Sequence, residues 1–151
     1  MDSLLSRNYS YYTVPAAFFT AAVPHAYAVL SSRVHYDNAN PRNHDHSVAK
    51  SDILDKVTQQ RVLRAKAASG NGFETLGFFA AAVLAANVSG VPVATLNLLT
   101  LGYVATRVVY NVAYVWLCTN RRRAALRSAT WILGVSLVVT LWIKAANRAM
   151  A

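Results

Sequence analysis

TVPAAFFTAAVPHAYAVLSS, the stretch from Thr13 to Ser32, contains no Asp, Glu, Lys or Arg, and only His25 and two prolines interrupt it. About twenty such residues in a helix cross a bilayer core of ~30 Å, so this stretch predicts a membrane span over 13–32. A cleaved signal peptide is the alternative, because the small residues Ala26 and Ala28 follow the apolar run. The weakly basic leader and the prolines at 15 and 24 favour instead a kinked helix packed among others.

The composition of the whole chain is typical of a membrane protein. Of its 151 residues, 55% are hydrophobic and 14% are charged, a ratio unusual for a soluble fold. The net charge of +9 is concentrated in clusters between apolar runs, whereas a nucleic-acid-binding domain spreads its basic residues over a solvated face. The single cysteine, Cys118, excludes an intrachain disulfide framework. We therefore expect the lipid bilayer as a partner, and no nucleic acid.

Three further apolar runs predict spans over about 57–88, 91–119 and 126–146. Polar or turn-forming segments separate the spans, at 33–56, Asn87 to Pro92 and Asn120 to Arg123. The predicted fold is therefore all-α. It is a single domain over residues 1–151, an integral membrane four-helix bundle with up-down topology.

The first connection is rich in histidine and aspartate: His35, Asp37, His44, Asp45 and His46. In principle these side chains could bind a metal ion, but no helical or zinc-type spacing organises them. We therefore expect a solvated, turn-rich loop and no metal site.

The distribution of lysine and arginine predicts the orientation. The first and third connections, within 33–66 and 121–127, carry eleven of these residues, while the termini and the second turn carry three, Arg7, Lys144 and Arg148. The side with eleven is expected to be cytoplasmic, which leaves both chain ends luminal or exterior. The Asn-x-Ser sequons at Asn8 and Asn87 fall on that second side.

Two ionisable side chains interrupt the predicted spans, Glu74 and Arg107. Measured from the luminal turn, both lie ~21 to 23 Å along adjacent antiparallel helices, so they should reach the same depth. A charge in hydrocarbon costs at least ~2.5 to 3.5 kcal/mol, which normally demands a partner or a watery cavity. We therefore expect the carboxylate and the guanidinium to meet near the cytoplasmic face.

The spacing around each charge defines two polar helical stripes. Arg64, Asn71 and Glu74 share one face, and Arg107, Tyr110 and Tyr114 share another. A cavity between the stripes would offer guanidinium, carboxylate, amide and phenol groups, a set suited to a small zwitterionic peptide. The alternative is a buried salt bridge that only locks two helices, with tyrosines at the membrane interface.

The segment RVLRAKAASGNGFE, residues 61–74, resembles a signature of the MAPEG family, the membrane-associated proteins of eicosanoid and glutathione metabolism. The segment RVVYNVAY, 107–114, looks like the Arg-x-x-Tyr-x-x-x-Tyr stripe of the same family, and RAALRS, 123–128, looks like the start of its fourth helix. The resemblance spans roughly residues 10 to 148, and its polar motifs are specific in combination.

The resemblance implies a homotrimer that holds glutathione in a cytoplasm-facing cleft between neighbouring subunits. By motif position, the glutathione-binding residues would be Arg64, Asn71, Glu74, Arg107, Tyr110 and Tyr114. Arg127 would stabilise the thiolate with Ser128 as a helper, and Arg121 to Arg123 are rivals because the loop is longer than in relatives. Two departures concern Ala67, where many relatives have arginine, and Trp131, which replaces a tyrosine.

The predicted function is a membrane-bound, glutathione-dependent transferase or peroxidase acting on lipophilic electrophiles or hydroperoxides. The expected location is the endoplasmic reticulum membrane, or the inner membrane if the source is prokaryotic. One alternative is a non-enzymatic lipid-binding scaffold of the same fold. A transporter or channel subunit is a third hypothesis, disfavoured because polar stripes near one face make no path across the membrane.

Overall fold

The computed structural model describes residues 6–117 and 121–151, and of 121–123 only the backbone. Within this part of the chain all regular structure is helical. The α-helices are α2 (Ser10–Ser31), α3 (His44–Ala49), α4 (Lys56–Val88), α5 (Val93–Val112) and α6 (Arg121–Ala149). Short 3₁₀ turns cover Arg33–His35 and Pro41–Asn43, and a π-helical turn, η3 (Ala113–Leu117), continues α5.

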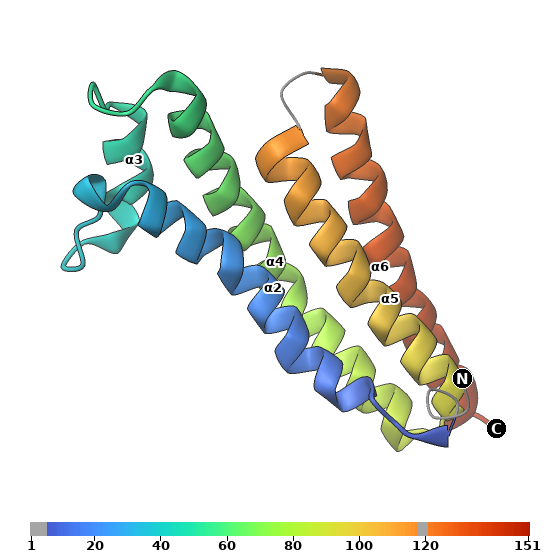
Figure 1. The fold of residues 1–151 in the computed structure, drawn as a ribbon. Helices are drawn as coiled ribbons and strands as arrows, with labels where there is room; N and C mark the ends of the chain where they lie inside the picture. Colours follow the sequence, from blue (N-terminus) through green and yellow to red (C-terminus); the bar gives the residue numbers. More distant parts are fainter. Residues whose placement is uncertain (1–5, 118–120) are drawn as a thin grey trace.

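The long helices lie side by side (Figure 1), with α2 packed on α4 and α5, and α6 packed on α5 and α4. The start of α2 and the end of α6 lie at the end of the molecule where α4 turns into α5 (Figure 1). The helix α3 lies at the opposite end, beside the start of α4. Successive long helices therefore run in alternating directions (Figure 1), while the four-helix membrane bundle stays a prediction.

Three of the helices are long and apolar enough to cross a membrane: Ser10–Ser31, Val93–Leu117 and Ala124–Ala149. They correspond to the spans predicted over 13–32, 91–119 and 126–146, and they support an integral membrane protein. The helix α4 has the predicted bounds but a polar first half, and it does not meet the same criterion among the described helices. That α4 crosses the membrane therefore stays a prediction.

Local signals explain where α4 begins and ends. The Asp55 carboxylate accepts hydrogen bonds from the backbone N–H groups of Val57 and Thr58, both at 3.0 Å, which caps the first turn. At the other end Gly90 has φ +74, and the N–H of Val91 donates to Ala86 O at 3.0 Å. This is a Schellman motif, which stops the helix and turns the chain into α5.

Proline within α2 creates a contact between helices. Pro24 has no N–H, so the carbonyl of Thr20, four residues earlier, loses its helical donor. The side-chain amide of Asn111 on α5 donates to that carbonyl at 2.7 Å. The proline therefore requires a polar partner from a neighbouring helix, as expected where no water reaches.

Small residues allow the helices to approach closely. A Cβ added to Gly72 on α4 would lie 2.7 Å from the Cβ of Ala21 on α2. A Cβ added to Gly134 on α6 would lie 2.9 Å from Thr106 Oγ1 on α5. Such contacts bring backbones together and are typical of helix packing in membranes.

The first connection is more structured than the expected solvated loop. His44 and Val48 on α3 are buried, with exposed fractions of 1% and 0%. The ring of Tyr36 packs edge-on against His44, and Lys66 on α4 forms an ion pair with Asp45 at 3.7 Å. The helical spacing of apolar residues did not reveal α3 in the sequence, because the helix is only six residues long.

A network of amides joins the helices at the end that carries the termini. Asn8 donates to Asn87 Oδ1 at 2.6 Å, and Asn87 donates to Ser10 Oγ at 2.9 Å. The Asn97 amide accepts from Tyr9 N–H at 2.8 Å and donates to Arg7 O at 2.7 Å. Both sequon asparagines thus hold the start of α2 against the end of α4.

Candidate functional site

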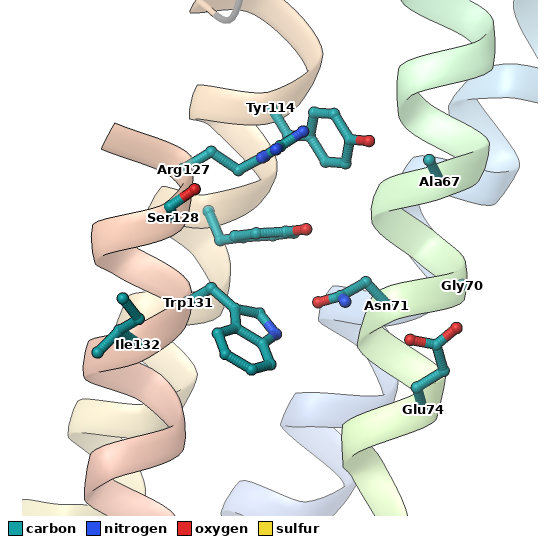
Figure 2. Close-up of a pocket in the computed structure, with 10 residues that line it drawn as sticks. Ala67, Gly70, Asn71, Glu74, Tyr114, Arg127, Ser128, Trp131 and Ile132 are labelled. Carbon is teal, nitrogen blue, oxygen red and sulfur yellow. The ribbon is translucent and has the colours of Figure 1, made fainter. Parts of the chain in front are cut away.

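A cleft of about 690 Å³ opens between α4 and α6. Figure 2 shows residues of α4 and residues of α6 facing one another across it. Its lining consists of Ala67, Gly70, Asn71, Glu74, Tyr110, Tyr114, Arg127, Ser128, Trp131 and Ile132. The volume falls within the range of about 300 to 1,000 Å³ that is typical of small-molecule sites.

The cleft brings together most of the side chains that the sequence singled out. These are Asn71, Glu74, Tyr110, Tyr114, Arg127 and Ser128. Arg64 and Arg107 do not line the cleft, although they were expected in the same set. Each of these two arginines instead donates hydrogen bonds to other residues of the chain.

Arg107 is buried behind the wall of the cleft, with 4% of its surface exposed. Its Nη2 donates to Asn71 O at 3.0 Å, to Asn71 Oδ1 at 3.1 Å and to Thr75 Oγ1 at 3.0 Å. Its guanidinium carbon lies 5.7 Å from the ring centroid of Tyr103 and 5.0 Å from that of Tyr110. Arg107 therefore fixes the Asn71 amide at the edge of the cleft.

The expected ion pair between Glu74 and Arg107 does not form, and that prediction is wrong. Glu74 is exposed and lines the cleft, and no described cation lies within ion-pair distance of it. The depth was predicted correctly, since Arg107 contacts the turn of α4 that contains Glu74. The difference is rotational: Asn71 and Thr75 are one turn apart and face Arg107, whereas Glu74 is ~100° away from Thr75 around the helix.

Arg64 locks α4 to the end of α5. Its Nε and Nη2 donate to the backbone oxygen of Val115, at 3.3 and 3.2 Å. Val115 lies within the π-helical turn η3, where the altered backbone pairing leaves carbonyl groups differently placed from those of an α-helix. A role in direct ligand contact was predicted for Arg64, and this geometry assigns it to holding the wall instead.

Arg127 is the described cation that lines the cleft. It is half-buried, and its guanidinium carbon lies 4.6 Å from the centroid of the Tyr114 ring, a cation–π contact that fixes its position. Ser128, the next residue, donates to Ala124 O at 3.4 Å. The side chains of the rivals Arg121, Arg122 and Arg123 lie outside the described residues.

Several residues of the site were missed from sequence. Thr75 lies one turn after Asn71, accepts from Arg107 and shares a 3.0 Å hydrogen bond with Tyr103. Ile132 forms part of the α6 wall. Extending each polar stripe by one turn would have found Thr75 and Tyr103, but no sequence signal marks Ile132 as facing the cleft rather than lipid.

Both departures from the family pattern fall on the cleft. Ala67 lines its α4 wall and Trp131 lines its α6 wall. An exposed alanine at position 67 provides no side-chain donor, so this part of the wall contributes space rather than charge. Among the described side chains, the cleft therefore offers a guanidinium and a hydroxyl on α6, a carboxylate and an amide on α4, and phenol groups from α5 and η3.

The MAPEG family model matches residues 11–147, nearly the whole chain and every cleft residue. The chain belongs to the MAPEG family. Membership identifies it as a membrane protein connected in general with glutathione or eicosanoid metabolism. No curated protein and no solved structure matches it.

Proposed function

We propose that this MAPEG protein is a glutathione-dependent transferase or peroxidase that binds glutathione in the cleft between α4 and α6. The single observation that carries the proposal is the opposition of Arg127 on α6 to Asn71 and Glu74 on α4 across one cleft (Figure 2). Neither Arg127 nor Glu74 has a described ion-pair partner of its own. Both charges are therefore available to a ligand.

The donor set fits a zwitterionic thiol peptide. Glu74 would accept from the amino group, and the Asn71 amide would bind a peptide or carboxylate group. Tyr110 and Tyr114 add phenol groups on the third side of the cleft. Because Arg107 holds Asn71 through both its backbone and its side-chain oxygen, this edge is preorganised before a ligand arrives.

Arg127 would activate the thiol. A free thiol has a pKa of about 8.5, so it is mostly protonated at neutral pH, and the thiolate is the nucleophile. A guanidinium next to the sulfur stabilises the anion, and each unit of pKa lowering corresponds to ~1.4 kcal/mol. Arg127 is half-buried and held by Tyr114, so its charge is less screened than that of a fully solvated arginine. The thiol proton would pass to water. The Ser128 hydroxyl, now 3.4 Å from Ala124 O, would have to turn away from that carbonyl to donate a hydrogen bond to the sulfur.

The membrane supplies the second reactant and the remaining walls. We infer four membrane-crossing helices with the cleft near the cytoplasmic face, in the endoplasmic reticulum or an equivalent membrane. In lipid the exposed Glu74 would cost at least ~2.5 to 3.5 kcal/mol, so the carboxylate needs water, a ligand or a neighbouring subunit around it. A neighbouring subunit at the cleft would meet this need, and the family resemblance provides the number of subunits, so we propose a homotrimer with the cleft at a subunit boundary. Lipophilic electrophiles or hydroperoxides would enter from the bilayer.

Purified protein in detergent tests the proposal through two measurements. Calorimetric titration with glutathione should give saturable binding, and turnover should appear with a generic electrophile, a lipid hydroperoxide or both. Binding without turnover would leave the chain a scaffold that holds glutathione. The absence of binding would remove the proposed function and favour a lipid-binding scaffold.

A further inference from the structure

The π-helical turn η3, which continues α5, is held to α4 by the side chain of Arg64. Its Nε and Nη2 donate to Val115 O at 3.3 and 3.2 Å, and Val115 is fully buried. Carbonyl groups in the last turn of a helix lack helical partners, and a basic side chain can bind them. Arg64 therefore caps the described end of this helix, at Leu117, from a neighbouring helix.

Two polar contacts join the same pair of helices at different spacings. Arg64 and Asn71 lie seven residues apart on α4, about two turns, and so share a face. Their partners Val115 and Arg107 lie eight residues apart along α5 and η3. A turn with i→i+5 bonds takes up one residue more than a turn with i→i+4 bonds, so the π-helical turn accommodates the additional residue. The bonds of Arg64 thus favour η3 over a continued α-helix.

The turn η3 also carries a side chain that lines the cleft, Tyr114. The centroid of its ring lies 4.6 Å from the guanidinium carbon of Arg127 on α6 (Figure 2). The same ring packs edge-on against Tyr110, with centroids 5.6 Å apart. Successive residues of an α-helix differ by ~100° in direction, so a return of η3 to α-helical pairing would rotate Tyr114 away from Arg127. The position of the Tyr114 ring therefore depends on η3.

We propose that Arg64 is a positioning residue for Arg127, and that it acts through η3 and Tyr114. The two bonds to Val115 O hold the turn, the turn places the tyrosine ring, and the ring holds the guanidinium by a cation–π contact. Arg64 itself does not line the cleft. The inference deepens the proposed function and rests on it, because Arg127 is the residue proposed to stabilise the thiolate.

Chemical modification of Arg127 tests the inference without glutathione. An arginine-selective dicarbonyl reagent would be applied in detergent to the wild type, Arg64→Leu and Arg64→Lys, and the rate at Arg127 would be followed by mass spectrometry. Arg64→Leu should raise that rate about twofold to thirtyfold, the range that corresponds to loss of a cation–π contact. Arg64→Lys keeps a single donating nitrogen and should give an intermediate rate. If Arg64→Leu does not fold, Arg64→Lys takes its place, with a smaller change in the same direction.

Arg61→Leu is the matched control. Arg61 lies one turn before Arg64 on α4, and its Nε has no hydrogen-bond partner among the described residues. This variant removes the same kind of side chain from the same helix and should leave the rate at Arg127 unchanged. An equal acceleration in Arg61→Leu would contradict the inference.

A double mutant tests whether Tyr114 is the link. Tyr114→Leu alone should expose Arg127 to the reagent as Arg64→Leu does. In the Tyr114→Leu background, Arg64→Leu should add little, because the ring through which Arg64 acts is already absent. Independent effects that multiply would show that Arg64 reaches Arg127 by another route, and would overturn the inference.

The thiol of bound glutathione gives a second readout that a merely structural role would not move. Arg64→Leu should raise the thiol pKa toward its free value of about 8.5, and should lower turnover most at neutral pH, with a loss that shrinks as the pH rises. Lower thermal stability with an unchanged rate at Arg127 and an unchanged thiol pKa would leave Arg64 as a helix clamp only and overturn the inference. If the wild type binds no glutathione, the proposed function fails, and the modification rates alone decide whether Arg64 positions Arg127.

Discussion

Arg107 and Asn71 form a bifurcated contact across two helices, in which one guanidinium nitrogen reaches the backbone oxygen at 3.0 Å and the side-chain oxygen at 3.1 Å. The contact fixes an amide at the rim of the cleft from a position that no cleft ligand reaches. Arg107 is therefore a positioning residue.

Replacing Arg107 by leucine should weaken both the fold and glutathione binding. The Asn71 and Thr75 oxygens would lose their donor in a partly buried position, which costs about 1 to 3 kcal/mol. Thermal unfolding in detergent and calorimetric titration measure the two effects. Arg107→Lys keeps a donor and should restore part of the stability, and Arg148→Leu, at an exposed arginine, should change neither quantity. A fully stable Arg107→Leu variant with normal affinity would exclude the positioning role.

Glu74→Gln should lower the affinity for glutathione by about tenfold to a hundredfold, the range for a hydrogen bond to a charged group. The carboxylate lines the cleft without a described cationic partner, so its charge is free for the amino group of the ligand. Glutathione with a blocked amino group provides the matched comparison. Wild type should bind this analogue more weakly than glutathione, whereas Glu74→Gln should bind the two alike. A variant that still discriminates between them would place the amino group elsewhere.

The link between Pro24 and Asn111 makes a double-mutant prediction. Asn111→Leu leaves the Thr20 carbonyl without a donor, so the free energy of unfolding should fall by about 1 to 3 kcal/mol. Pro24→Ala returns the missing backbone N–H to α2. In that background Asn111→Leu should cost far less, because the carbonyl again has its helical partner. Additive effects of the two substitutions would show that the side-chain bond does not replace the helical one.

His44 should make the stability of the first connection depend on pH. Ser32 Oγ donates to Ala28 O at 2.7 Å, so His44 Nε2, 2.8 Å from that hydroxyl, must be the donor and Nδ1 carries no proton. Nδ1 is buried without a hydrogen-bond partner. Burial, followed by the charge of Lys66, lowers the pKa of His44 from its ordinary 6.5, while Asp45 opposes the shift.

The direction in which stability changes with pH follows from the lowered pKa of His44. Below pH 6.5 the unfolded chain takes up a proton at His44 before the folded chain does, so stability is lost as the pH falls through that region. Protease cleavage within 33–55 should therefore accelerate between neutral and mildly acid pH. His44→Gln keeps a donor toward Ser32 but does not titrate, and should flatten the profile. His25, Lys66 and Asp45 also face His44, and an unchanged profile in this variant would show that His44 is not the group responsible.

The sequence predicted where the helices lie along the chain better than it predicted which side of each helix faces its neighbours. Hydropathy found the three apolar helices, whereas the Asp55 cap and the positive φ of Gly90, which explain the bounds of α4, were recognised only in the structure. Helical spacing also placed Glu74 and Arg107 at one depth. It could not decide which residue of that turn faces Arg107, because the answer depends on how α4 and α5 are rotated about their axes. The same uncertainty hid the bond from Arg64 to Val115, which requires the π-helical turn.

The most direct test of the central claim is the pKa of the glutathione thiol in the complex, followed through the ultraviolet absorbance of the thiolate during a pH titration of the protein in detergent. Wild type should hold the thiol pKa well below its free value of about 8.5. Arg127→Ala should return the pKa toward that value while glutathione still binds, and Arg148→Ala should have no effect. A bound thiol with an unshifted pKa in the wild type, or an equal shift without Arg127, would contradict the account.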